Sequence, residues 1–136
     1  MQKRIFAVFF ACSLLLIGCF GAAFAGIEHA DSGDAFRSKV LDSKGIVLVD
    51  FWASWCGPCM RQGEILERLA AQQPELRIVK VSTESQDTPA AMYRIQSIPT
   101  LMIFKDGKPI DRWSGVTEIP VINGRVEHAK KIKIPE

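Results

Sequence analysis

An apolar run leads directly into a pair of cysteines, and this junction constrains the fold more than any other part of the sequence. Residues 46–53, I-V-L-V-D-F-W-A, form a continuous β-branched and aromatic run, typical of a strand buried on both faces. C-G-P-C follows at residues 56–59, and the residues from 59 to 73 are mostly helix formers with one apolar stripe. The sequence therefore predicts a buried strand, a C-x-x-C turn and a helix in immediate succession.

Periodicity along the rest of the chain predicts further alternation of helices and strands. Residues 26–33 are either a linker or a first strand, and K-D-G-K at 105–108 predicts a hairpin. The last helix contains Pro120 and Gly124, which we expect to disturb it. The predicted helices cover residues 34–41, 59–73, 88–95 and 117–131, and the predicted strands cover 46–53, 76–82, 100–104 and 109–114.

This order of elements predicts an α/β fold in which a central mixed β-sheet is flanked by helices on both faces. The predicted elements use the whole chain from residue 26 onward, so we expect one domain over residues 26–136.

Residues 1–25 have the composition of a targeting segment. Lys3 and Arg4 precede a long apolar run that closes with A-F-A at Ala25, which predicts a secretory signal peptide cleaved after that alanine. A buried helix and an uncleaved membrane anchor are alternatives. A third alternative is L-I-G-C, which resembles a bacterial lipobox and would make Cys19 the lipidated first residue. We therefore expect export to the periplasm or cell envelope.

The charge balance excludes a strongly basic or acidic domain. The chain has 17 basic and 15 acidic residues, and residues 1–25 hold two of the basic ones and no acid, which leaves a net charge of zero beyond them. No basic patch for nucleic acid is visible, and the cluster Lys130, Lys131 and Lys133 is expected to be a solvated helix end. No exposed apolar seam is evident, so we expect a monomer.

The cysteine count limits what the C-x-x-C pair does. Cys12 and Cys19 lie in the export segment, so the domain itself holds a single pair. Disulfide frameworks of small exported domains need several pairs, and a zinc site needs two more ligands. His29 and His128 are far apart and lack ligand spacing, so we expect no metal.

The predicted position of the pair favours redox chemistry. Cys56 falls at a helix N-terminus, where unpaired backbone N–H groups and the helix dipole lower the pKa of a thiol. Cys59 lies one turn further on, within reach of a disulfide. No G-x-G-x-x-G motif is present for a nicotinamide or flavin. We therefore expect no bound cofactor beyond the redox-active disulfide, with electrons supplied by a partner.

The segment V-L-V-D-F-W-A-S-W-C-G-P-C, residues 47–59, resembles the active-site sequence of the thioredoxin family. I-P-T at 98–100, F-K-D-G at 104–107 and Gly115 follow in the family's order and spacing, so the resemblance covers about residues 34–115. It implies the thioredoxin fold and a protein-disulfide reductase acting on disulfide-containing client proteins.

The resemblance also implies roles for the residues around the cysteines. Cys56 would be the nucleophile and Cys59 the resolving thiol. Gly57 and Pro58 would form the spacer, and Trp55 would flank the exposed sulfur.

Three further residues would support the cysteines. Asp50 matches the family's buried acid, which assists proton transfer at the resolving cysteine. It interrupts an apolar strand, where burial should raise its pKa, unless it turns to solvent at the strand end. Lys80 falls where the family often keeps a lysine near that acid, although strand alternation also allows it to point outward. Trp52 would support the site from beneath.

Ile98, Pro99 and Thr100 would bind the substrate. Pro99 matches the family's cis-proline, beside which the backbone would pair with an extended client peptide; an ordinary trans proline at a strand entry is the alternative. The chain departs from the family where Glu64 replaces a common proline and where S-T-E-S replaces N-x-D after the third strand.

Export would separate the protein from cytosolic reductases, so we expect a membrane thiol-electron donor. Three alternatives stay open: an envelope disulfide oxidase or isomerase, a client-specific reductase of the cytochrome maturation type, and a docking module in which the thiols are incidental.

Overall fold

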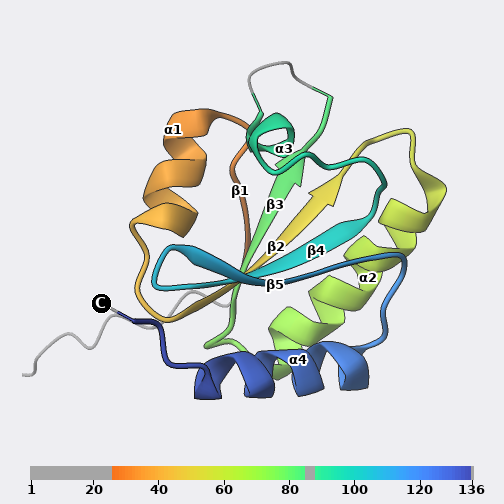
Figure 1. Ribbon diagram of the computed structural model, residues 1–136. Coiled ribbons are helices and arrows are strands. Elements are labelled where there is room, and N and C mark those ends of the chain that lie inside the picture. Colours follow the sequence, from red (N-terminus) through yellow and green to blue (C-terminus); the bar gives the residue numbers. More distant parts are fainter. Residues whose placement is uncertain (1–25, 85–87, 136) are drawn as a thin grey trace, which may run out of the picture.

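A five-stranded mixed β-sheet forms the centre of the computed structural model, which describes residues 26–84 and 88–135 (Figure 1). The strand order is β1-β3-β2-β4-β5, with β1, β3 and β2 parallel and β4 and β5 antiparallel to their neighbours. This arrangement confirms the predicted mixed sheet. The strands are β1 (Ile27–His29), β2 (Ile46–Trp52), β3 (Arg77–Ser82), β4 (Thr100–Lys105) and β5 (Lys108–Ser114).

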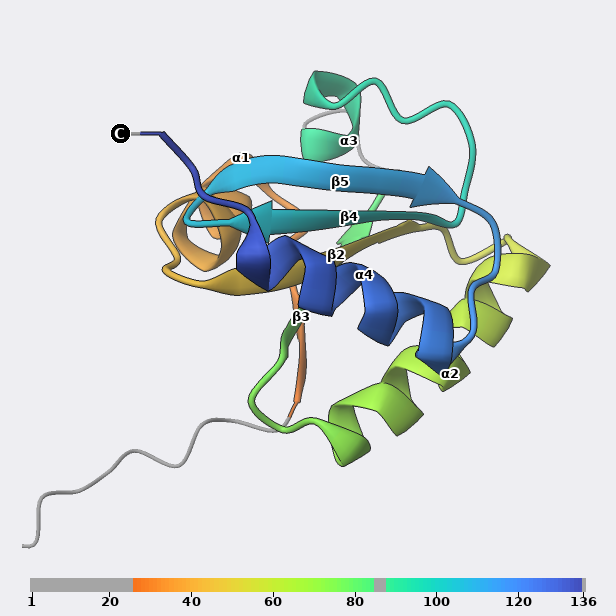
Figure 2. The same cartoon turned by 60° about the horizontal axis from the view of Figure 1, so that its bottom comes forward.

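Helices cover both faces of the sheet, as Figures 1 and 2 show. The first helix, α1, continues without a break into a π-helical turn, η1, and packs with α3 on one face. The other two, α2 and α4, pack on the opposite face. The helical segments are α1 (Gly33–Phe36), η1 (Arg37–Leu41), α2 (Gly57–Gln72), α3 (Pro89–Met92) and α4 (Ile119–Lys131).

Strand alternation in β2 divides the core into two layers. Val47, Val49 and Phe51 are buried against α1 and α3, whereas Leu48 is buried against α2 and α4. Asp50 has the same parity as Leu48 and is also fully buried. The strand is therefore covered on both faces, as its apolar sequence predicts, and its one acid lies beneath α2.

Two predicted helices have different ends in the structure. The short helix predicted over residues 88–95 stops at Met92, because Arg94 adopts a left-handed backbone conformation with φ of 49°. The predicted disturbance of the last helix is wrong. Helix α4 begins at Ile119, so Pro120 lies in the first turn, where its missing N–H breaks no helical hydrogen bond. Gly124 is exposed within a continuous helix.

The β4–β5 hairpin fixes two neighbouring elements. Asp106 and Gly107 both have positive φ, of 50° and 78°, which is the backbone of a type I′ turn. The Asp106 carboxylate accepts a hydrogen bond from the Gly45 N–H at 2.8 Å. At the end of β4, the Lys105 ammonium donates to the carbonyls of Ala129, Lys130 and Ile132, and so satisfies the C-terminus of α4.

The predicted signal peptide and the alternative lipidation at Cys19 fall outside the described residues. Among the helices of residues 26–84 and 88–135, none combines the length and the apolar character needed to cross a membrane.

Candidate active site

The two cysteines lie at the junction between β2 and α2. Cys56 is the N-cap of α2, with an extended backbone, and it forms a disulfide with Cys59 across a Cα–Cα distance of 5.2 Å. The backbone N–H of Cys59 donates to Cys56 Sγ at 3.2 Å. Pro58 lies in the first turn and has no N–H to leave unpaired. The helix thus begins two residues earlier than predicted, and it directs a backbone N–H at the Cys56 sulfur.

The disulfide is nearly covered, but a groove runs beside it. Cys56 is 5% exposed and Cys59 is fully buried, whereas the neighbouring Trp55 side chain is 75% exposed. Cys56 Sγ lies 3.8 Å from the Ile98 carbonyl oxygen. The groove has a volume of about 270 Å³ and is lined by Trp55, Thr83, Ile95, Gln96, Ser97 and Ile98.

The peptide bond between Ile98 and Pro99 is cis, as expected from the I-P-T motif. Pro99 is buried, and its carbonyl accepts a hydrogen bond from the Gly115 N–H at 2.9 Å. Thr100 begins β4 and donates its hydroxyl to the Ser97 carbonyl at 2.6 Å. The loop is thereby fixed at both ends and brings the Ile98 carbonyl to the Cys56 sulfur.

Asp50 is the buried acid that the sequence predicts. Its side chain is 0% exposed, and neither carboxylate oxygen has a hydrogen-bond partner within the part of the chain that the structure describes. Burial raises the pKa of Asp50 from the usual 3.8 to about 7, and the positive charge of Lys80 offsets part of that rise. The carboxyl can therefore gain and lose a proton near neutral pH.

Lys80 faces the same side of the sheet as Asp50, not outward. The two residues are directly paired in the β2–β3 register. The ammonium lies 4.3 Å from the centroid of the Trp52 ring, and a Cβ at Gly63 of α2 would lie 3.2 Å from Nζ. No ion pair with Asp50 forms within 4.0 Å in the described residues. Lys80 therefore acts on the carboxyl through space, while it packs on the half-buried Trp52 beneath α2.

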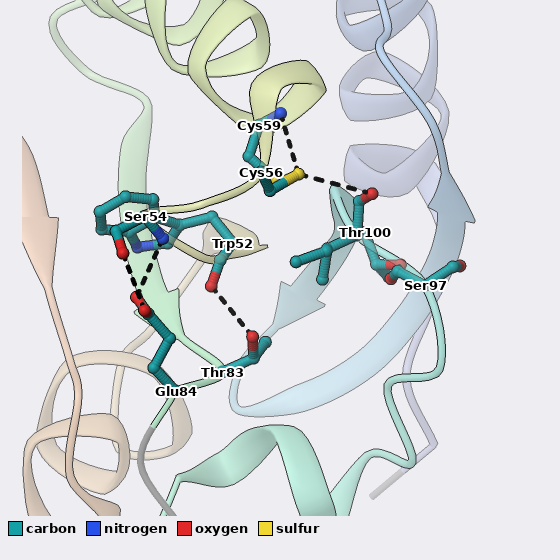
Figure 3. The surroundings of a disulfide bond; sticks show 9 residues. Trp52, Ser54, Cys56, Cys59, Thr83, Glu84, Ser97 and Thr100 are labelled. Carbon is teal, nitrogen blue, oxygen red and sulfur yellow. Dashed lines mark hydrogen bonds between the residues drawn. A yellow bond between two sulfur atoms is a disulfide. The ribbon is translucent and has the colours of Figure 1, made fainter.

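Glu84 fixes the segment before the cysteines through hydrogen bonds to Ser54. The sequence analysis noted only that this region departs from the family's N-x-D pattern and did not predict this role. The Glu84 carboxylate accepts from the Ser54 N–H at 2.9 Å and from the Ser54 hydroxyl at 2.8 Å (Figure 3). These hydrogen bonds lower the pKa of Glu84. The Thr83 hydroxyl adds a bond to the Trp52 carbonyl at 3.2 Å. Thr83 and Glu84 thus anchor the turn that leads into the C-x-x-C motif.

Gln62 is a second residue that the sequence reading missed. It is fully buried in α2, where its amide oxygen accepts from the Thr117 N–H at 2.7 Å and its amide nitrogen donates to the Thr117 carbonyl at 3.2 Å. Its burial could have been predicted from its position in the sequence, because residue 62 lies on the same helical face as Ile65, Leu66 and Leu69. Gln62 ties the cysteine-bearing helix to the β5–α4 connection.

The arrangement supports one kind of chemistry. A sulfur at a helix N-terminus is favoured as thiolate, a second thiol lies one turn away, and the buried Asp50 carboxyl beneath the same helix has a pKa of about 7. In the described residues, no three His, Cys, Asp or Glu side chains gather closely enough to hold a metal ion. The fold and the site together define a thiol–disulfide oxidoreductase.

Comparisons with known proteins identify the family. The thioredoxin family model matches residues 28–127. Thioredoxin of Chlamydia trachomatis is 47% identical over 76 residues, which cover 56% of this chain and 74% of that protein. Thioredoxin 1 of Nostoc sp. is 42% identical over 104 residues, covering 76% and 95%. The crystal structure of Fasciola hepatica thioredoxin superposes with a TM-score of 0.68 at 31% identity, covering 74% and 97%.

The chain therefore belongs to the thioredoxin family and has the thioredoxin fold. Like its relatives, it exchanges thiols and disulfides with disulfide-containing substrates through the C-x-x-C pair.

Proposed function

We propose that this member of the thioredoxin family reduces disulfide bonds of client proteins in the cell envelope and is recharged by a membrane thiol-electron donor. The observation that carries the exchange chemistry is the N-cap geometry, in which the Cys59 N–H donates to Cys56 Sγ at 3.2 Å. A hydrogen bond and a helix dipole directed at the sulfur favour the Cys56 thiolate, which is the attacking species. The reducing direction is supported by the Gly57-Pro58 spacer, which resembles that of the reducing members of the family.

In the first step, the Cys56 thiolate of the dithiol form attacks a client disulfide. A bond forms between Cys56 Sγ and one client sulfur, the client disulfide breaks, and the second client sulfur leaves as a thiolate. The client segment lies in the groove between Trp55 and the Ile98–Pro99 loop, where its backbone pairs beside the cis-proline.

In the second step, Cys59 attacks the mixed disulfide. Asp50 is ionised above its pKa of about 7 and accepts the Cys59 proton. Cys59 Sγ then bonds to Cys56 Sγ, and the first client sulfur leaves as a thiolate. Two electrons have passed to the client, and the protein is left with the Cys56–Cys59 disulfide, which an external dithiol must reduce.

The cellular site of this reaction rests on residues 1–25. Their basic start, apolar middle and A-F-A end support export, with cleavage after Ala25, lipidation at Cys19 or an uncleaved membrane anchor as the routes to the envelope. A client pool and a dithiol donor are then both needed outside the cytosol. One chain supplies the groove and both cysteines, so the proposed exchange needs no second copy of the protein.

The reduction potential of the Cys56–Cys59 pair tests the direction of electron flow. The purified protein is equilibrated with defined thiol–disulfide buffers, and the dithiol fraction is measured by alkylation. We expect a reduction potential of roughly −270 mV, the value typical of thioredoxin. A value near about −120 mV, as in a strong oxidant, would contradict a reductase and would indicate an envelope oxidase.

Trapping and fractionation test the remaining parts. Cys59→Ser should accumulate mixed disulfides with client proteins, and the matched Cys56→Ser variant should accumulate none. Cell fractionation of the full chain, with Cys19→Ala beside the unchanged protein, separates lipidation from cleavage after Ala25. Recovery of the protein in the cytosol alone would contradict the envelope assignment without affecting the exchange chemistry.

A further inference from the structure

Three hydroxyl groups are linked beside the cis-proline. Ser97 and Thr100 flank the Ile98–Pro99 bond, and Ser114 lies opposite Thr100 in the β4–β5 register. The Ser97 hydroxyl lies 3.1 Å from the Ser114 hydroxyl, which in turn lies 2.7 Å from the Thr100 hydroxyl. Figure 3 shows Ser97 and Thr100 on one side of the disulfide and Glu84 on the other. None of these three hydroxyls enters the exchange steps described above.

The direction of each hydrogen bond follows from the proton count. A carbonyl oxygen only accepts, so Thr100 donates its single hydroxyl proton to the Ser97 carbonyl at 2.6 Å. Thr100 must therefore accept from Ser114 in their 2.7 Å contact. With its proton given to Thr100, Ser114 accepts from Ser97. The chain of donation runs from Ser97 to Ser114 to Thr100 and ends on a backbone carbonyl.

Only acceptor capacity is left at the surface. A hydroxyl has one donor and two acceptor sites, and all three protons are already used. Thr100 is buried, whereas Ser97 and Ser114 are exposed. Ser97 Oγ keeps two open lone pairs and Ser114 Oγ keeps one. To donate outward, Ser97 would have to give up its bond to Ser114.

Ser97 places this acceptor surface beside the route of the client segment. Ser97 lines the same groove of about 270 Å³ as Trp55 and Ile98. The Ile98 carbonyl is 3.8 Å from Cys56 Sγ, so a client chain joined to Cys56 passes within a residue or two of Ser97. A side chain of that segment, next to the reacting cysteine, meets the open lone pairs.

We propose that Ser97 and Ser114 form a specificity subsite that prefers clients with a hydrogen-bond donor side chain, such as lysine, arginine, asparagine or glutamine, beside the reactive disulfide. A carboxylate there is disfavoured, because lone pairs would face lone pairs. Thr100 is a positioning residue that fixes the direction of the chain. The inference rests on the proposed disulfide reductase activity and names the clients that it favours.

Matched peptide substrates test the subsite. The peptides share one intermolecular disulfide and differ only at a residue flanking the cysteine, which is alanine, glutamine, lysine or glutamate, with the two flanking positions tested in turn. The full chain in its dithiol form reduces each peptide, and kcat/KM is obtained from the change in tryptophan fluorescence. We expect the glutamine and lysine peptides to exceed the alanine peptide by about 2- to 12-fold at one flanking position, the range of one net hydrogen bond. The glutamate peptide should be the slowest.

Variants assign the preference to the hydroxyls. Ser97→Ala should bring the ratio of the glutamine to the alanine peptide close to one. Ser114→Ala frees the Ser97 proton to donate outward, so it should raise the glutamate peptide toward the alanine peptide, whereas Ser114→Thr, which keeps a hydroxyl, should retain the original order. Ser38→Ala is the matched control, because that exposed serine donates only within its own helical segment, to the Ala35 carbonyl. It should leave the ratio unchanged.

The outcomes separate the subsite from the activity. Equal kcat/KM for all four peptides would overturn the subsite and leave the reductase standing. A glutamine preference that survives Ser97→Ala, or that Ser114→Thr fails to retain, would also overturn it. Failure to reduce any of the peptides would instead contradict the proposed reductase function.

Discussion

The buried carboxyl of Asp50 should make the stability of the protein depend on pH in an unusual direction. Its pKa is about 7 in the folded protein, against 3.8 for the free side chain. Between these values the folded state holds a proton that the unfolded chain has lost, so stability falls as the pH rises. One pKa unit corresponds to about 1.4 kcal/mol, so the full difference is about 4 kcal/mol.

Asp50→Asn removes this titration and keeps the shape of the protonated acid. We expect the variant and the unchanged protein to have similar unfolding free energies near pH 4. The variant should then become progressively more stable by comparison, up to about 4 kcal/mol near pH 8. Urea unfolding of the oxidised proteins, followed by tryptophan fluorescence at each pH, measures the difference.

Glu84→Gln is the control with the opposite sign. The Ser54 hydrogen bonds lower the pKa of Glu84, so the carboxylate contributes stability above its usual pKa range and loses that stability as the pH falls. This variant should therefore be the less stable one at neutral pH, with the difference shrinking in acid. Parallel pH curves for Asp50→Asn and the unchanged protein would refute the argument, because they would mean that the Asp50 carboxyl has an ordinary pKa.

Three further changes test contacts around the site. Gln62→Leu should lower the unfolding free energy by about 1–3 kcal/mol, measured in urea, because the half-buried Thr117 loses two hydrogen bonds that contribute about 0.5–1.5 kcal/mol each. Lys80→Met removes the positive charge that lowers the pKa of Asp50, so the pH profile of disulfide reduction should shift its Asp50-dependent limb to higher pH. Lys105→Met should cost about 1–3 kcal/mol in the same urea assay and expose the end of α4 to faster amide exchange.

Exposed residues of the same types supply the controls. Gln72→Leu changes an exposed glutamine in the same helix as Gln62, and Lys131→Met changes an exposed lysine in α4; both should stay within about 0.5 kcal/mol of the unchanged protein. Equal effects of Gln62→Leu and Gln72→Leu would mean that the Thr117 contacts do not stabilise the fold. An unshifted pH profile for Lys80→Met would mean that Lys80 does not influence the Asp50 carboxyl.

Local sequence patterns were enough to predict much of the fold. The apolar run at residues 46–53 predicted β2, and the C-x-x-C motif marked the start of α2, because burial on two faces and helix capping are properties of short segments. Pro120 shows where such reasoning fails. In sequence it lay inside a predicted helix, but the helix begins one residue before it, and helix boundaries depend on what the first turn packs against.

By itself, the sequence determined that a thiol pair follows a buried strand at a helix N-terminus, and hence that the protein performs thiol–disulfide exchange. It could not decide whether Lys80 turns inward, because alternation fixes that two faces differ but not which one meets Asp50. The parallel β2–β3 register decided it. The Gln62–Thr117 contact and the hydroxyls of Ser97 and Ser114 likewise join residues far apart in the chain. Only the tertiary structure brings such groups within hydrogen-bond distance, because no local spacing encodes the approach of separate loops.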